Sequence, residues 1–136
     1  MHYSLSRAAV ALVILTAPFA AHAATPAKGW YSSIGTSSNC PQFNGEANLY
    51  FPGAGKAGLL TYNQVSAATE QILTWSAPPA ASGNYSGSAT GYTQPGNTPD
   101  SFTFTGSITY IDVNSFVWSY AAYGCSFDTV NYYTGK

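Results

Sequence analysis

The chain is short of the side chains that most enzymes use. Charged residues make up 7% of its 136 residues, and both histidines, His2 and His22, lie with the only arginine, Arg7, near the start. Without histidine, residues 24–136 cannot build a Ser-His-Asp or Cys-His catalytic site, or the usual imidazole sites for zinc and copper. We therefore expect a protein that carries no metal and no cofactor, and we favour a non-enzymatic role while leaving an enzyme as an alternative.

The first 23 residues have the composition of a secretory signal peptide. Arg7 supplies a positive charge, Ala8–Leu15 is an apolar run, and Ala21-His22-Ala23 has small residues where a signal peptidase cleaves. The run is shorter than the roughly 20 apolar residues that cross a bilayer. We expect residues 1–23 to be removed, leaving one all-β domain at 24–136 that is secreted or periplasmic, with no transmembrane anchor.

Residues 24–136 carry three lysines and five carboxylates, a net charge of −2. A balance this small argues against nucleic acid as a partner, because nucleic-acid binding needs many cationic side chains. The surface must be covered mainly by hydroxyl and amide groups. Such a surface suits a neutral ligand or a protein partner, and it is equally typical of structural β proteins.

The hydrolytic scheme still open to the chain is a pair of carboxylates, as in glycoside hydrolysis. The candidates are Glu46, Glu70, Asp100, Asp112 and Asp128. Asp112 lies where a turn favours aspartate, and an Asp such as Asp128 within a strand is expected to face solvent. We therefore assign no catalytic residue.

Strict alternation of apolar and polar residues dominates Ser101–Tyr133. In Ser101–Asp112 one face carries Phe102, Phe104, Gly106, Ile108 and Tyr110, while the other carries serine and threonine, the period of a half-buried strand. Asp112–Ser115 has turn chemistry, and the same alternation then resumes twice. This pattern predicts three antiparallel strands.

Earlier segments add shorter strands, predicted at Lys28–Gly35, Glu46–Phe51, Leu59–Val65, Glu70–Ala77 and Asn84–Tyr92. With no convincing helix, seven or eight strands form a small antiparallel β-barrel or β-sandwich. We favour the barrel, because closure removes strand edges that so few lysines could not protect. Gln94–Asp100 is expected to be a loop.

Two cysteines, Cys40 and Cys125, occur in the predicted exported segment. In an oxidising compartment they are expected to form one disulfide. A reactive thiol would need a cationic neighbour or a helix N-terminus, and the sequence offers neither locally.

Aromatic residues are the strongest indication of function, at 15% of the chain. We expect Trp75, Trp118 and Tyr110 in the core and Trp30 at one end of the barrel. Rings with a polar edge also bind sugars and protein partners. The ligand-binding candidates are those near loops or glycines: Tyr85, Tyr92, Tyr132, Tyr133 and Trp30.

Gly29-Trp30-Tyr31 resembles the opening of lipocalin-like and avidin-like barrels. The resemblance covers these three residues and implies an up-and-down β-barrel. It carries over no ligand-binding residue.

The sequence thus leaves three functional hypotheses. The first is a non-enzymatic exported β domain that binds an uncharged, carbohydrate-like ligand or a protein partner through exposed aromatic residues. The second is a secreted enzyme inhibitor or an envelope or adhesin-like structural subunit, with Gln94–Asp100 as an inserting loop. The third is a carboxylate-only glycoside hydrolase.

Overall fold

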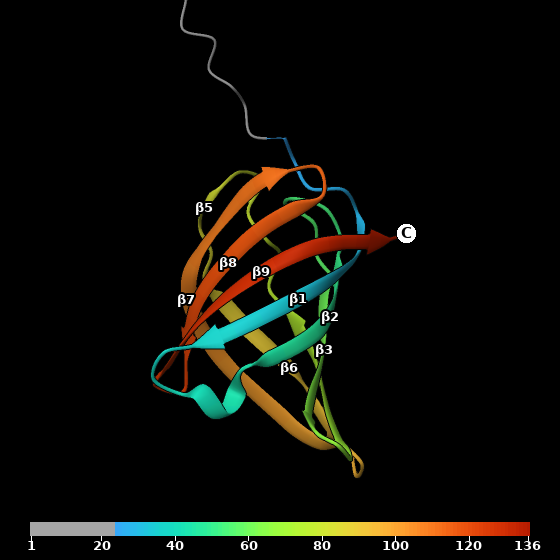
Figure 1. Cartoon of the computed structure of the whole chain (residues 1–136), viewed down its shortest axis with the longest axis vertical. Helices are drawn as coiled ribbons and strands as arrows, with labels where there is room; N and C mark the ends of the chain where they lie inside the picture. Colours follow the sequence, from blue (N-terminus) through green and yellow to red (C-terminus); the bar gives the residue numbers. More distant parts are fainter. Residues whose placement is uncertain (1–23) are drawn as a thin grey trace, which may run out of the picture.

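The computed structural model describes residues 24–136, so the predicted signal peptide at 1–23 lies outside the described residues. Eight antiparallel strands close into a barrel in the order β1-β2-β3-β4-β6-β7-β8-β9, and β9 pairs with β1 (Figure 1). The barrel strands are β1 (Gly29–Ser37), β2 (Gly45–Phe51), β3 (Leu59–Ser66), β4 (Thr69–Trp75), β6 (Gly87–Gln94), β7 (Thr98–Asp112), β8 (Ser115–Ala122) and β9 (Cys125–Gly135). The predicted all-β fold is confirmed, and it is a barrel rather than a sandwich.

A short extra strand and one helical turn complete the described part of the chain. The strand β5 (Gly83–Asn84) pairs with β7, and the 3-10 turn η1 (Pro41–Phe43) lies between β1 and β2. No helix within residues 24–136 has the length and apolar character needed to cross a membrane.

Closure of the barrel depends on the long strand β7. Its first half pairs with β6, from Thr98 to Phe104, and its second half pairs with β8, beginning at Thr105. Beyond the start of β6, β5 takes the place beside β7, where Gly83 lies opposite Ile108. One strand of 15 residues therefore joins the two halves of the sheet and leaves little unpaired edge.

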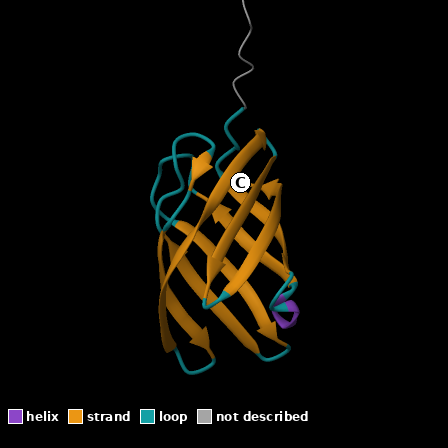
Figure 2. Ribbon diagram, turned by 90° about the vertical axis from the view of Figure 1, so that its left-hand side faces the viewer, coloured by secondary structure: helices purple, strands orange, loops and turns teal. Residues whose placement is uncertain are grey.

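One end of the barrel is filled by a closely packed aromatic core. Phe116 packs against Tyr31 and Phe51 with ring centroids 5.1 Å apart in both pairs. The tyrosine hydroxyls find main-chain acceptors, since Tyr31 donates to the Ala27 carbonyl and Tyr110 to the Pro79 carbonyl. The loops at this end, drawn in teal beside the C-terminus in Figure 2, cover the core. We call this the closed end.

The strands predicted from Ser101 to Tyr133 are confirmed. The turn after β7 forms as expected, with the Asp112 carboxylate accepting a hydrogen bond of 2.7 Å from the Asn114 N–H. Trp75, Trp118 and Tyr110 are buried, also as expected.

Two local expectations are wrong. Gln94–Asp100 is not a loop along its whole length, because β7 begins at Thr98 and a tight turn joins it to β6. Trp30 does not close one end of the barrel: it lies on the outer face against Tyr50 and Tyr62, with centroids 5.2 and 5.8 Å away. The reason is register, because Tyr31 points inward and its neighbour on the strand must point outward.

Candidate functional site

The end of the barrel opposite the closed end contains a cavity of about 280 Å³. Its lining comes from β1, β2, β3, β4, β7, β8, β9 and η1, so nearly every strand contributes to it. The tips of the β3–β4 and β6–β7 hairpins project past η1 at this end (Figure 1). We call this the open end.

The cavity exists because several inward residues of β1 to β4 near the open end are polar or small. On β1 the inward positions are Ser33 and Gly35, whereas Ile34 points outward and is 42% exposed. On β4 Gln71 lines the cavity, while Ile72 between Gln71 and Leu73 faces outward. This is the reverse of the usual apolar-inward pattern, and it leaves space inside the barrel that hydrogen-bonding groups surround.

Two indoles form the floor of the cavity, between the hollow and the core. Trp75 and Trp118 meet edge to face with centroids 4.7 Å apart. Trp75 Nε1 donates to Thr61 Oγ1 at 2.9 Å, which fixes that indole against β3. Trp118 packs against Tyr85 on the core side, so the floor is held rigidly from below.

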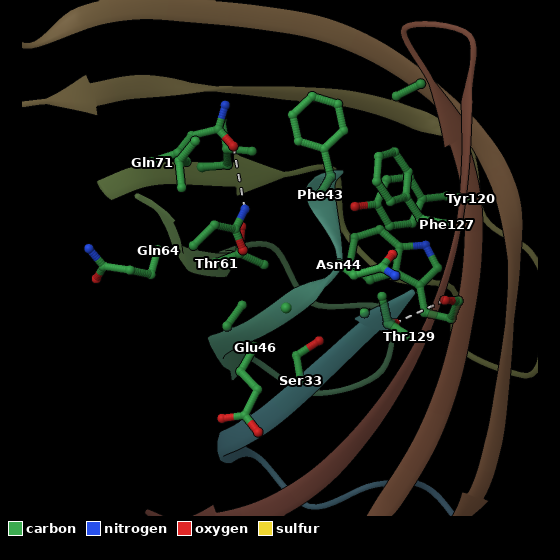
Figure 3. A pocket seen from close by; sticks show the side chains of 18 of the residues that line it. Ser33, Phe43, Asn44, Glu46, Thr61, Gln64, Gln71, Tyr120, Phe127 and Thr129 are labelled. Carbon is green, nitrogen blue, oxygen red and sulfur yellow. Dashed lines mark hydrogen bonds between the residues drawn. The ribbon is translucent and has the colours of Figure 1, made fainter. Parts of the chain in front are cut away.

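An aromatic wall rises from the floor along β8 and β9. Tyr120 and Phe127 stack at 5.0 Å with their planes 23° apart, and Phe43 of η1 lies 6.3 Å from Phe127 (Figure 3). Burial raises the pKa of Tyr120 to about 12, so its hydroxyl is neutral at ordinary pH. The wall therefore presents uncharged ring faces.

A polar wall lies across the cavity from these rings (Figure 3). Asn63 Nδ2 donates to Gln71 Oε1 at 3.4 Å, and Gln71 Nε2 donates to Asp100 Oδ2 at 2.6 Å. Tyr123 completes the chain by donating its hydroxyl to Asp100 Oδ1 at 2.7 Å. This hydrogen bond to a carboxylate raises the pKa of Tyr123. The linked side chains come from β3, β4, β7 and the β8–β9 turn, and they hold one another in place.

The lip of the cavity is tied down by the Cys40–Cys125 disulfide, which confirms the predicted pairing. The bridge joins the β1–β2 connection, which carries Phe43, to the first residue of β9. Asn39 adds two hydrogen bonds, donating to the Gly124 carbonyl at 2.8 Å and accepting from the Ser126 N–H at 2.9 Å. The aromatic wall is thus fixed at its outer edge.

None of the five residues predicted to bind ligand lines this cavity. The expectation that Tyr85 is exposed is wrong: it is 2% exposed and donates its hydroxyl to the Ser76 carbonyl. Tyr92 and Tyr132 are 37% and 52% exposed. Trp30 also lies on the outer face, where it packs against Tyr50. Tyr133 is partly buried against the core.

The sequence pattern does not reveal the cavity residues, because polar residues on a strand are usually expected to face solvent. Ser33, Thr61, Asn63 and Gln71 occupy strand positions that alternate with Ile34, Tyr62 and Ile72. A rule that places apolar residues in the core would put Ile34, Tyr62 and Ile72 inside the barrel. The signal for a hollow barrel is a polar residue two positions from a buried apolar one, repeated on several neighbouring strands. Gln71, two residues before Leu73, is an example.

The carboxylates are spread over the barrel. Asp112 lies in the turn at the closed end, and Asp128 is exposed and accepts a hydrogen bond from Ser119 at 2.7 Å. Glu46 reaches the lip, and Figure 3 shows its carboxylate turned away from the aromatic wall. Asp100 belongs to the polar wall. Within residues 24–136, no three His, Cys, Asp or Glu side chains cluster as a metal site would require.

Charge is distributed unevenly along the barrel. Lys28 precedes β1, Lys56 lies between β2 and β3, and Lys136 follows β9, so all three are at the closed end. Asp100 and Glu46 are at the open end. No cation of the described segment therefore lies near the cavity to attract an anionic ligand.

Comparisons with protein-family models, with curated proteins and with solved structures find no match for this chain.

Proposed function

We propose that residues 24–136 form a non-enzymatic binding protein that holds a small uncharged molecule, carbohydrate-like in presenting both a ring face and polar edges, inside the open end of the barrel. The observation that carries this proposal is the pairing of an aromatic wall with a hydrogen-bonding wall above an indole floor. Concave sites with this combination of apolar surface and a few fixed polar groups are the usual form of small-molecule sites.

The size of the cavity sets the size of the ligand. Its volume of about 280 Å³ is near the lower limit of roughly 300 Å³ for pockets that bind drug-sized molecules. A ligand of one or two rings therefore fits between Phe127 and Gln71, with a longer substituent emerging at the open end.

The charges favour a neutral ligand. Asp100 is the charged group of the polar wall, and both of its carboxylate oxygens already accept hydrogen bonds. An anion would lie near this carboxylate without a compensating cation, which costs free energy in a partly buried site.

Ligand-observed NMR on the mature protein, with a library of neutral mono- and disaccharides and small uncharged ring compounds, tests the proposal. Gln71→Met keeps the length of the side chain and removes its hydrogen bonds, so it should weaken any hit about tenfold, as loss of a buried polar contact does. Phe127→Ala should weaken the same hit. Tyr132→Ser, on the exposed outer face, is the matched control and should leave affinity unchanged.

The outer face offers the second candidate location for such a ligand. Trp30 and Tyr62, with Asn48 and Glu70, line a shallow hollow on the outside of the barrel. Tyr62→Ser removes one ring from this hollow and leaves the cavity intact. A hit that is lost in Tyr62→Ser and retained in Gln71→Met binds outside and contradicts the cavity proposal.

We also propose that residues 1–23 are a signal peptide and that the single β domain at 24–136 acts outside the cytoplasm. The disulfide supports this location, because such bonds persist in oxidising compartments. Mass spectrometry of the exported protein should give a first residue of Ala24. A full-length product retained in the cytoplasm with reduced cysteines would contradict it.

A further inference from the structure

We infer that the floor of the cavity binds an acceptor oxygen of the carbonyl type at the inner end of the ligand. This inference rests on the proposed function and specifies the chemical group that the floor selects. It begins from a difference between the two indoles, since Trp75 has an acceptor for its N–H and Trp118 has none in the described chain.

The Trp118 indole is buried and lines the cavity. It is 1% exposed, and its Nε1 atom finds no hydrogen-bond partner within residues 24–136. A buried donor without an acceptor is costly, because it has lost its hydrogen bonds to water and gained nothing in return. Nε1 itself is almost fully covered, so a ligand oxygen that reaches this edge of the indole after a small shift of the neighbouring side chains recovers that loss on binding.

The neighbouring side chains are arranged so that none of them takes this role. Thr129, opposite Trp118 on β9, donates its hydroxyl to the Trp118 carbonyl at 2.9 Å and accepts from Asn131 Nδ2 at 3.1 Å. The same Asn131 amide group also donates to the Phe116 carbonyl at 3.2 Å. These bonds hold the Thr129 hydroxyl toward the main chain and away from the indole N–H.

The other hydroxyls at the floor add donors. Thr61 Oγ1 accepts from Trp75, which leaves the Thr61 proton free to donate, and it donates to no group in the part of the chain that the structure describes. Ser33 also lines the cavity and its hydroxyl has no partner among these residues. The floor therefore offers three donors: Trp118 Nε1–H, Thr61 Oγ1–H and Ser33 Oγ–H.

A carbonyl oxygen suits this set of donors. A ketone, amide or lactone carbonyl has two lone pairs and no proton, so it can accept from more than one of these donors at once. An ammonium group would place donors against donors and would find no carboxylate at the floor. The floor thus orients an uncharged ring compound with its carbonyl inward.

Acetophenone and α-methylstyrene form a matched pair of probes, because they differ only in the replacement of the carbonyl oxygen by a methylene group. Each is titrated into the ¹⁵N-labelled mature protein while the three indole N–H signals are followed; Trp→Phe variants assign those signals. Acetophenone should move the Trp118 indole proton downfield, as a new hydrogen bond does, and should bind about tenfold tighter, a difference of about 1.4 kcal/mol.

Trp118→Phe keeps an aromatic ring at the floor and removes the free donor, so it should abolish the preference for acetophenone. Trp30→Phe is the control, because it removes an indole N–H on the outer face of the barrel, and the preference should remain. Equal binding of the two probes to the wild-type protein overturns the inference and leaves the proposed function standing. Failure of both probes to bind also overturns the inference, whereas the proposed function falls only if no member of the library of neutral saccharides and ring compounds binds.

Discussion

Removing the disulfide should destabilise the protein strongly through its effect on the unfolded chain. The bridge connects residues 85 positions apart in the sequence. On the chain-entropy relation, releasing a loop of this length costs about 4.6 kcal/mol of stability at room temperature. At about 4 °C for each kcal/mol in a domain of this size, the melting temperature should fall by about 15 to 20 °C.

The double variant Cys40→Ser and Cys125→Ser, compared with the oxidised protein by urea denaturation, measures this effect. Because the unfolded chain expands without the bridge, the dependence of the free energy of unfolding on urea should also steepen. The folded barrel should change little, since Asn39 still ties the lip to Gly124 and Ser126 by two hydrogen bonds.

Asn39→Ala in the oxidised protein is the matched control, because it removes those two hydrogen bonds and keeps the bridge. It should cost about 1 to 3 kcal/mol, with no steepening of the urea dependence. A double cysteine variant that loses less than about 1 kcal/mol would refute the unfolded-state reasoning. A loss of about 4.6 kcal/mol without any change in the urea dependence would show that the bridge acts mainly on the folded lip.

Three further predictions concern the barrel itself. Gly91→Ala should prevent folding, because a Cβ there would overlap a carbonyl of β4, whereas Gly45→Ala, which meets nothing within 4 Å, should be tolerated; soluble yield and circular dichroism compare them. Burial raises the pKa of Tyr31 and Tyr110 to about 12 from 10.0. The free energy of unfolding should therefore be unaffected by these tyrosines below pH 10 and should fall between pH 10 and pH 12, by about 1.4 kcal/mol per pH unit for each of them. Urea denaturation at rising pH measures this decrease. Trp118→Ala should cost about 3 to 5 kcal/mol in the same assay, as loss of a buried aromatic side chain does.

The closed half of the barrel could be predicted from the sequence, because its strands obey the ordinary alternation. Phe104, Ile108 and Tyr110 all point inward along β7, as their spacing indicates. The turn at Asp112 and the disulfide followed from local chemistry that does not depend on the rest of the fold. Closure into a barrel followed from the scarcity of charged residues that could protect open edges.

The open half could not be predicted in the same way. There the interior is a polar cavity, so the polarity of a residue no longer shows which face it lies on: Gln71 points inward in phase with Leu73, and Ile72 faces outward. Tyr85 illustrates a second difficulty. Its burial depends on the pairing of β5 with β7, and the glycines on either side of it in the sequence are more typical of an exposed loop. The chain of contacts from Gln71 to Asp100 spans 29 positions and is visible only in three dimensions.

We propose that the ligand binds inside the barrel, and chemical-shift mapping of a bound hit on the ¹⁵N-labelled mature protein tests this location. A ligand inside the barrel should shift the indole signals of Trp75 and Trp118 and the Gln71 side-chain amide, while the indole signal of Trp30 on the outer face stays in place. Shifts confined to Trp30 and its neighbours on the outer face, with the cavity signals unmoved, would contradict it.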